Sequence, residues 1–164
     1  MSNAPHSASP CIAAALRAAS RRLTLLYDEV MAPSGLRVTQ FHILSELERR
    51  ASEPPTVSEL AEILTMERSA LGQTLRPLER GGLIALGRDE HDGRRRPVEL
   101  TAAGKGAIAR GRPYWTKAHK RFERFFGGTG LAALRTTLRE LAEDPDLSDA
   151  FKTGGRANAA KHQS

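Results

Sequence analysis

The sequence has few of the residues that build disulfides or metal sites. Cys11 is the only cysteine among 164 residues, which excludes an intrachain disulfide and a zinc site made of several cysteines. The five histidines are scattered, and none has the close spacing of a hydrolytic metal motif. No glycine-rich loop follows a predicted strand, and no serine lies in a nucleophile elbow. We therefore expect no catalytic site, no metal and no cofactor.

Long hydrophobic runs are absent as well. No stretch approaches the length of a membrane span, and the N-terminus lacks the basic start and apolar block of a signal peptide, so we expect a cytoplasmic protein. The composition, 40% hydrophobic and 27% charged, is typical of a soluble folded chain with one core of ordinary size. The formal net charge of +6 favours polyanionic partners such as nucleic acid, although many basic proteins bind none.

Residues 56 to 80 predict two short helices joined by a tight turn. Thr56 lies three residues before Glu59, which is the spacing of a capping box at a helix N-terminus. An apolar face with helical spacing follows the cap. Its members are Val57, Leu60, Ile63 and Leu64. A break at Thr65-Met66 separates this helix from the next.

The second of these helices, residues 68 to 80, has one apolar and one polar face. Leu71, Leu75 and Leu78 share the face that we expect to be buried. The other face carries small, hydroxyl, amide and guanidinium side chains, which can approach base edges and phosphates in a major groove. These residues are Ser69, Gly72, Gln73, Thr74 and Arg76. We therefore expect the polar face of this helix to be exposed on the surface.

A β-hairpin with a basic tip is predicted next. Two β-prone runs, residues 83 to 87 and 98 to 101, flank Asp92-Gly93, a hairpin turn signal. Arg94, Arg95 and Arg96 follow that turn directly. Three arginines on an exposed ribbon can reach a phosphate backbone or a narrow minor groove. The simpler alternative is a solvated charged loop.

Three strings in this region resemble the MarR family of bacterial winged helix-turn-helix repressors. They are Val57-Ser-Glu-Leu-Ala-Glu-Ile-Leu, Met66-Glu-Arg-Ser-Ala-Leu-Gly-Gln-Thr-Leu-Arg-Pro-Leu-Glu-Arg-Gly-Gly-Leu and Asp92-Gly-Arg-Arg-Arg-Pro-Val-Glu-Leu-Thr-Ala-Ala-Gly. The resemblance covers roughly residues 12 to 142 and rests on several separate motifs. It implies a fold that is mainly α with a small β-hairpin wing, and a homodimer that binds double-stranded DNA at a roughly palindromic operator and is associated with the nucleoid when bound.

The resemblance also assigns roles to residues. Residues 68 to 80 match the recognition helix, which the family's similar Leu-Arg-Pro-Leu string implies is continuous through Pro77, and residues 88 to 96 match the wing. The implied DNA-binding residues are Arg68, Ser69, Gln73, Thr74, Arg76, Arg94, Arg95 and Arg96. Gln73 stands where close relatives commonly have arginine. This departure leaves base preference open, because an amide suits adenine and arginine suits guanine.

Apolar helices flank the winged segment on both sides. From Ile12 to Val30 apolar residues recur every three or four positions, and a similar pattern runs from Ile108 to Phe125, where Pro113 predicts a kink or a broken turn. We expect a disordered tail over residues 1–10, a first dimerisation helix over 11–37, a DNA-binding region over 38–101, C-terminal dimerisation helices over 102–150 and a second disordered tail over 151–164. The alternative is that these seams pack within one subunit.

Several aromatic side chains are candidates for an effector pocket. The family binds small aromatic or anionic effectors between the first two helices and the long fifth one, and Tyr27, His42 and Trp115 would line that space. Phe122 and Phe125 are further candidates. For each aromatic residue, filling the core is the simpler interpretation.

Cys11 raises an alternative function. The peroxide-sensing branch of the family has a reactive cysteine in its first helix, and a thiol near a helix N-terminus favours thiolate chemistry. An alignment on Ser20, Tyr27 and Gln40 puts Ala13 at the sensing position, and two residues turn a helix by about 200°. An inert cysteine is therefore the simpler interpretation. The remaining alternatives are a thiol-based oxidant sensor and a non-specific architectural DNA-binding protein.

Overall fold

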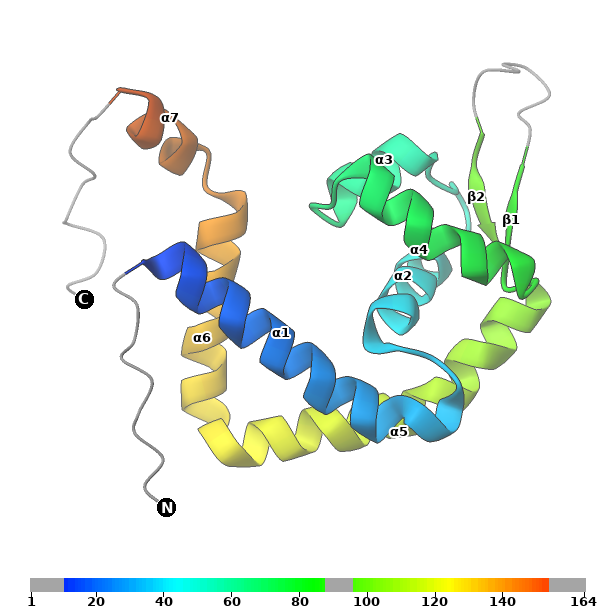
Figure 1. Cartoon of the computed structure of the whole chain (residues 1–164), viewed down its shortest axis with the longest axis horizontal. Helices are drawn as coiled ribbons and strands as arrows, with labels where there is room; N and C mark the ends of the chain where they lie inside the picture. The colour runs from blue at the N-terminus through cyan, green and yellow to red at the C-terminus, as the bar shows by residue number, and fades with distance from the viewer. Residues whose placement is uncertain (1–10, 88–95, 154–164) are drawn as a thin grey trace. The chain divides into compact units, whose positions relative to one another are not determined.

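The structure, a computed structural model, describes residues 11–87 and 96–153 (Figure 1). The chain forms two compact units, residues 1–119 and 120–164, and α5 (Ala102–Phe126) belongs to both. The first unit also holds α1 (Ile12–Met31), a 3-10 turn (Ala32–Ser34), α2 (Val38–Arg49), α3 (Val57–Ile63), α4 (Arg68–Arg80), β1 (Ile84–Leu86) and β2 (Val98–Leu100), and the second holds α6 (Gly128–Glu143) and α7 (Pro145–Thr153). No helix in the described ranges is both long and apolar enough to cross a membrane.

The predicted fold, mainly α with one small hairpin, is confirmed. The capping box at the start of α3 is present: the Thr56 backbone N–H donates to Glu59 Oε2 (2.7 Å), and the Glu59 N–H donates to Thr56 Oγ1 (3.3 Å). The α3–α4 turn is also where the sequence predicts it. Thr65 has a φ of +50° there, and the Met66 N–H donates to the Ala61 carbonyl (2.8 Å). A β-branched residue in this left-handed conformation is strained.

One hydrophobic core holds the first unit together. It receives side chains from the end of α1, from α2, α3 and α4, from both strands and from the first turns of α5. Its largest fully buried members are Met31, Ile43, Leu44, Leu47, Leu60, Leu71, Leu78, Ile108 and Val98. The three leucines predicted for the inner face of α4 are all buried, which leaves the opposite face of this helix exposed.

Two elements bear on the expectations. α5 is continuous through Pro113, so the broken turn, one of the two predicted alternatives, is absent, and the kink stays a prediction. Ile108 and Ala118, on either side of this proline, are buried, and their packing outweighs the lost backbone hydrogen bond. α7 extends to Thr153, so residues 151–153 are helical rather than part of a tail. Pro145, which ends α6, also begins α7, because proline suits the first position of a helix and Asp144 Oδ1 accepts the Asp146 N–H (2.9 Å).

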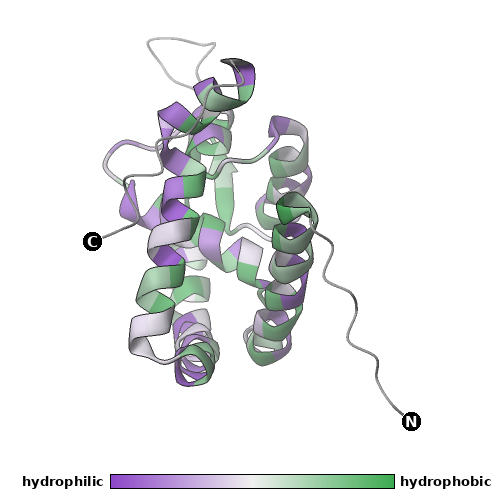
Figure 2. Cartoon of the chain, turned by 90° about the vertical axis from the view of Figure 1, so that its left-hand side faces the viewer, coloured by the Kyte–Doolittle hydropathy of each residue, from purple (hydrophilic) through white to green (hydrophobic). Residues whose placement is uncertain are grey.

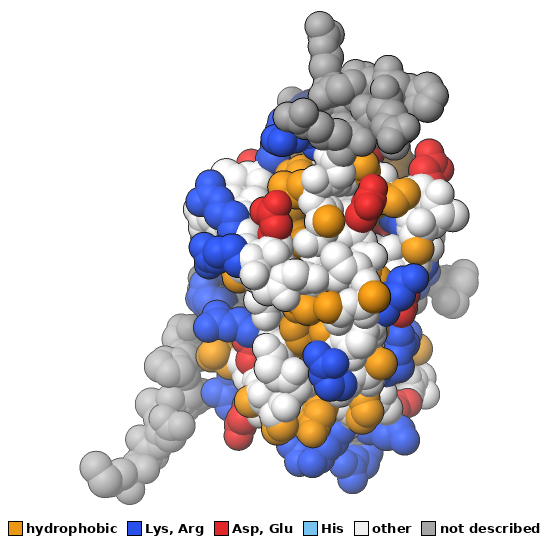
Figure 3. Space-filling model, turned by 90° about the vertical axis from the view of Figure 1, so that its right-hand side faces the viewer, with side chains coloured by type: hydrophobic (Ala, Val, Ile, Leu, Met, Phe, Trp, Pro, Cys, Tyr) orange, Lys and Arg blue, Asp and Glu red, His pale blue; other side chains and the backbone are white. Residues whose placement is uncertain are grey.

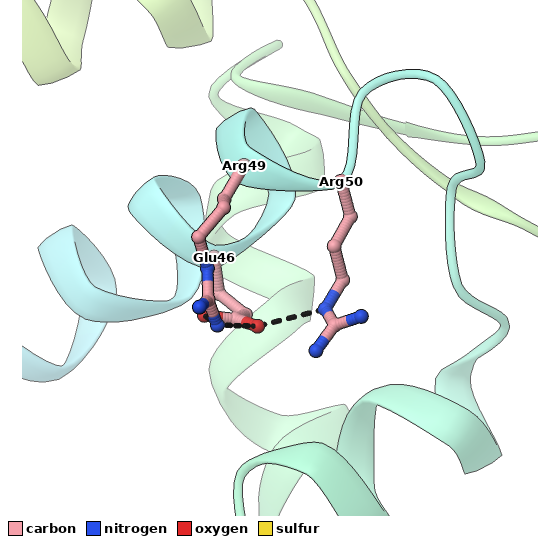
Figure 4. A network of polar contacts seen from close by, with 3 residues as sticks. All are labelled: Glu46, Arg49 and Arg50. Carbon is pink, nitrogen blue, oxygen red and sulfur yellow. Dashed lines mark hydrogen bonds and ion pairs between the residues drawn. The ribbon is translucent and has the colours of Figure 1, made fainter.

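A buried carboxylate lies at the end of α2 (Figure 4). Glu46 is only 7% exposed, and its oxygens accept from Arg49 Nη2 (2.6 Å) and Arg50 Nε (2.8 Å). Burial alone would raise the pKa of Glu46, but the hydrogen bonds and charges of both arginines outweigh it and hold the pKa below its usual value. Since the side chain of Arg49 is 69% exposed and that of Arg50 is 40% exposed, solvent screens both pairs, and they contribute only modestly to stability.

The hairpin is attached to its surroundings at its base. β1 and β2 pair antiparallel with Ile84 opposite Leu100, and Pro97 forms a bridge with Thr56 at the start of α3. On the other side, Thr101 Oγ1 donates to the Gly82 and Leu83 carbonyls (2.7 and 3.0 Å) and accepts the Gly104 N–H (3.0 Å). One hydroxyl group therefore begins α5 and ties it to the chain that leaves α4.

Gly104 allows this junction to close. A Cβ atom at this position would lie 2.2 Å from the Leu83 carbonyl oxygen and 2.6 Å from Leu100 Cδ1, and the first of these is a backbone atom that cannot rotate away. Only glycine lets the first turn of α5 pack so closely against the strand.

We predict that Gly104→Ala lowers the free energy of unfolding by about 1–3 kcal/mol, the usual cost of overpacking a tight contact. Urea unfolding followed by circular dichroism measures the change. Gly106→Ala is the matched control two residues on, because its Cβ would approach only the flexible Arg110 guanidinium (3.4 Å). The control should be neutral or slightly stabilising. Equal stability of the two variants would show that α5 is not seated against Leu83.

Candidate nucleic-acid interface

The outward face of α4 brings together most of the predicted contact residues. Arg68, Ser69, Gln73 and Arg76 are all exposed, and α4 lies with α3 and the hairpin at one end of the first unit (Figure 1). Within the described residues, no hydrogen bond or ion pair involves either arginine side chain. The guanidinium groups of both residues are therefore not held by any described residue.

Thr74 differs from these four residues. It is half-buried, and its hydroxyl donates to the Ala70 carbonyl oxygen one turn earlier (3.1 Å). Its proton is thus used within the helix, although the oxygen can still accept a hydrogen bond. Thr74 lies at the edge of the outward face rather than at its centre.

The arginines of the wing are only partly described. Arg96 is exposed and directly precedes Pro97, which pairs with Thr56, so Arg96 lies close to the start of α3. Arg94 and Arg95 lie outside the described residues, so their predicted contacts remain predictions. Lys and Arg side chains are spread over the face of the molecule seen from the hairpin side (Figure 3).

Gly72 occupies an unusual position in α4. It lies in the interior of a 13-residue helix, where glycine costs roughly 0.5–1 kcal/mol relative to alanine. A Cβ atom added to it would meet nothing within 4 Å, and its φ is not positive. Neither a steric contact within the described structure nor a special backbone conformation therefore requires glycine here.

A cavity of about 510 Å³ lies between α1, α2 and α5 in the first unit. This volume is within the range of small-molecule sites. The lining residues are Thr24, Val38, Thr39, Phe41, His42, Ser45, Arg112 and Trp115. Ser45 Oγ is buried and has no hydrogen-bond partner in the described structure, and Arg112 Nη2 pairs with Glu48 Oε2 (2.9 Å). The lining thus includes a serine with a buried, unsatisfied hydroxyl group and an arginine that is paired with Glu48.

The three residues predicted for an effector pocket fall in two places. His42 and Trp115 line the cavity, whereas Tyr27 is not among its lining residues. The Tyr27 hydroxyl lies 3.3 Å from His119 Nδ1, and the His119 ring stacks on Trp115 with centroids 5.0 Å apart. Phe41 stacks on Trp115 at 6.1 Å. Tyr27 therefore lies next to a neighbour of the cavity wall, His119.

Comparisons with known proteins agree with this geometry. Residues 34–95 match the model of the MarR family. The transcriptional regulator MosR of M. tuberculosis, solved in complex with DNA, is similar over 87% of this chain and 98% of its own, with 29% identity and a TM-score of 0.73. Residues 34–95, from the 3-10 turn to the hairpin, are thus similar to the MarR family. A probable transcriptional regulator from Pseudomonas aeruginosa is similar over 80% of this chain and 97% of its own (25% identity, TM-score 0.71).

A more distant likeness concerns the fold alone. CouR from Rhodococcus jostii RHA1, solved with p-coumaroyl-CoA, is 21% identical over 82% of this chain and 94% of its own, with a TM-score of 0.68. No curated protein sequence matches the chain. The family and its solved members are transcriptional regulators, which agrees with the expectation that this protein is not an enzyme.

Several residues of the site were not predicted. Ser45, Arg112 and His119 were missed because they are polar residues within helical runs, and only the packing of α1, α2 and α5 brings them to the cavity or next to it. Arg112 could have been nominated from its place one position before Pro113 in an otherwise apolar seam. Nothing local distinguishes Ser45 from the other serines of the chain.

Two helical regions of the chain expose apolar side chains. In α1, the predicted seam leaves Ile12, Leu16 and Leu26 with exposed fractions of 68%, 39% and 46%. Figure 2 shows hydrophobic and hydrophilic residues interspersed along the helices. In the second unit, the rings of Phe122 and Phe125 both pack against Phe126, and Phe125 itself is 83% exposed. Cys11, the N-cap residue of α1, is exposed as well.

Proposed function

We propose that this protein is a dimeric transcriptional regulator, acting as a repressor, that binds a roughly palindromic operator and is released by a small-molecule effector. The observation that carries this proposal is the exposed polar face of α4 beside the base of the hairpin. The likeness to MosR, which was crystallised with DNA, supports the same function. Two such faces about one helical turn of DNA apart (roughly 34 Å) would read two half-sites.

Within the operator, we assign different roles to α4 and the wing. Gln73 and Ser69 project from the centre of the outward face and would contact base edges, where an amide pairs well with adenine. Arg68, Arg76 and Thr74 lie nearer its edges and would contact phosphates. Arg94, Arg95 and Arg96 would hold the backbone or enter the minor groove. Phosphate contacts would set affinity and Gln73 would set sequence preference.

The exposed apolar faces support a dimer. A monomer would leave the seam of α1 and the aromatic group of Phe122, Phe125 and Phe126 in water, which is unfavourable for contiguous apolar surface. Pairing of two copies through α1 and the C-terminal helices would bury both surfaces. It would also hold two α4 helices at a fixed spacing, as a palindromic operator requires.

The cavity between α1, α2 and α5 is the proposed effector site. Phe41 and Trp115 provide flat apolar walls, and Ser45 and Arg112 provide a donor and a cation for one polar or anionic group. We infer that the effector is a small aromatic molecule with an acidic group. It would act by changing the spacing of the two recognition helices, and it can do so only if it binds the DNA-free form more tightly.

The DNA contacts are tested with two single variants. Arg94→Ala should weaken binding to an operator duplex and to a shuffled duplex by a similar factor and should lower the salt slope by about 1. Gln73→Ala should weaken binding to the operator alone, by roughly 5-fold or more. Fluorescence anisotropy measures both, using an operator that the wild-type protein selects from random DNA. Equal wild-type affinity for both duplexes would favour an architectural protein.

The dimer is tested with two adjacent leucines of α1. Leu26 belongs to the apolar seam, whereas Leu25 is 68% exposed and points about 100° away from it. Sedimentation velocity should give a dimer for the wild-type protein and for Leu25→Glu, and a monomer without operator affinity for Leu26→Glu. A wild-type monomer at micromolar concentration would refute the dimer, and dissociation by Leu25→Glu alone would put the interface on the other face.

The effector site has a built-in probe, because Trp115 is the only tryptophan of the chain. Phenolic carboxylates should quench its fluorescence and release the operator, and Ser45→Ala should weaken this binding roughly 10-fold by removing a hydrogen bond to a charged group. Ser58→Ala, in α3, is the control. Quenching that Ser45→Ala leaves unchanged would contradict this site. Release by peroxide that Cys11→Ser abolishes would favour the oxidant sensor instead.

A further inference from the structure

Because residue 72 is glycine, one edge of α4 has no side chain at this position. Successive helical residues are about 100° apart, so Gly72 lies between the buried Leu71 and the outward Gln73. Its neighbours four residues away on the same edge are Arg68 and Arg76, both exposed. This edge therefore presents two arginines with an open gap between them, into which no described side chain or backbone group reaches.

The charges of Arg68 and Arg76 indicate which kind of molecule would occupy the gap at Gly72. They lie eight residues apart, which is about 12 Å along the helix, and carry positive charge on both sides of a surface without a side chain. A sugar–phosphate backbone is the polyanion that suits two such charges, and its bulk would pass between them. A protein partner would more readily be met by apolar side chains than by an empty position.

We propose that Gly72 is the point where one DNA strand comes closest to α4, with its backbone lying across the glycine between Arg68 and Arg76. The inference rests on the proposed binding of DNA through α4. The missing side chain sets how deeply the helix enters the major groove, and thereby whether Gln73 and Ser69 reach the bases. Gly72 is a specificity-determining residue that makes no side-chain contact of its own.

If Gly72 has this role, one substitution should change the stability of the protein and its affinity for the operator in opposite directions. Alanine at position 72 has room in the free protein and is the better helix former, so Gly72→Ala should raise the Tm by about 2–4 °C. In the complex, the added methyl group would lift α4 away from the groove. Operator affinity should fall on the order of 10-fold. Binding to shuffled DNA should change less than about 2-fold, because the flexible arginines still reach the phosphates.

The experiment measures the Tm and the Kd for selected and shuffled duplexes in the wild-type protein, Gly72→Ala, Gly72→Ser and Gly106→Ala. Operator affinity should fall further in Gly72→Ser than in Gly72→Ala, because the side chain is larger. Gly106→Ala, also an interior helical glycine with space around it, should keep full operator affinity.

The outcomes are distinct. Full operator affinity in Gly72→Ala overturns the inference, as does an equal loss on both duplexes or a fall in the Tm. A wild-type protein that does not prefer its selected duplex would instead refute the proposed function, whatever the variants do. A Tm rise together with a loss confined to the operator supports the inference.

Discussion

The contact between the Leu83 carbonyl and the first turn of α5 is the constraint on which the positions of α4 and the hairpin depend. That oxygen accepts hydrogen bonds from the Thr101 N–H (3.2 Å) and hydroxyl (3.0 Å), and the absent side chain of Gly104 lets the helix close over it. Leu83 follows α4 and leads into β1, so the junction holds the end of α4, the hairpin base and the start of α5 together.

Sequence patterns predicted the parts of the fold that depend on local chemistry. The capping box at Thr56, the buried leucines of α4 and the hairpin flanking Asp92-Gly93 each follow from residue type and spacing, and the structure has all three elements. The outcome at Pro113 could not be predicted in this way. Whether a helix survives a proline depends on what packs on both sides, and the buried Ile108 and Ala118 decide it through contacts distant in sequence.

The cavity illustrates the same limit for the site. Its position between the first two helices and the fifth was predicted through the resemblance, and His42 and Trp115 do line it. The resemblance also implies Tyr27 for the wall, but Tyr27 is not among the lining residues, and its hydroxyl group lies 3.3 Å from His119 Nδ1. Ser45 carries the least local signal of all, since its interest lies in a missing hydrogen-bond partner, which only packing reveals.

Residues that are unfavourable for their backbone conformation or helix position cluster in the helix-turn-helix. Thr65 adopts a left-handed conformation that glycine or asparagine would tolerate better, and Glu67 caps α4 without a side-chain hydrogen bond. Gly72 and Pro77 both weaken the interior of the same helix.

Natural sequences otherwise agree with their folds at each level, and exceptions concentrate at functional sites. α4 is stabilised mainly by burial of Leu71, Leu75 and Leu78 in the core rather than by its own helix propensity. A recognition helix stabilised from one side is free to present on its other side whatever side chains, or absence of them, a DNA groove requires.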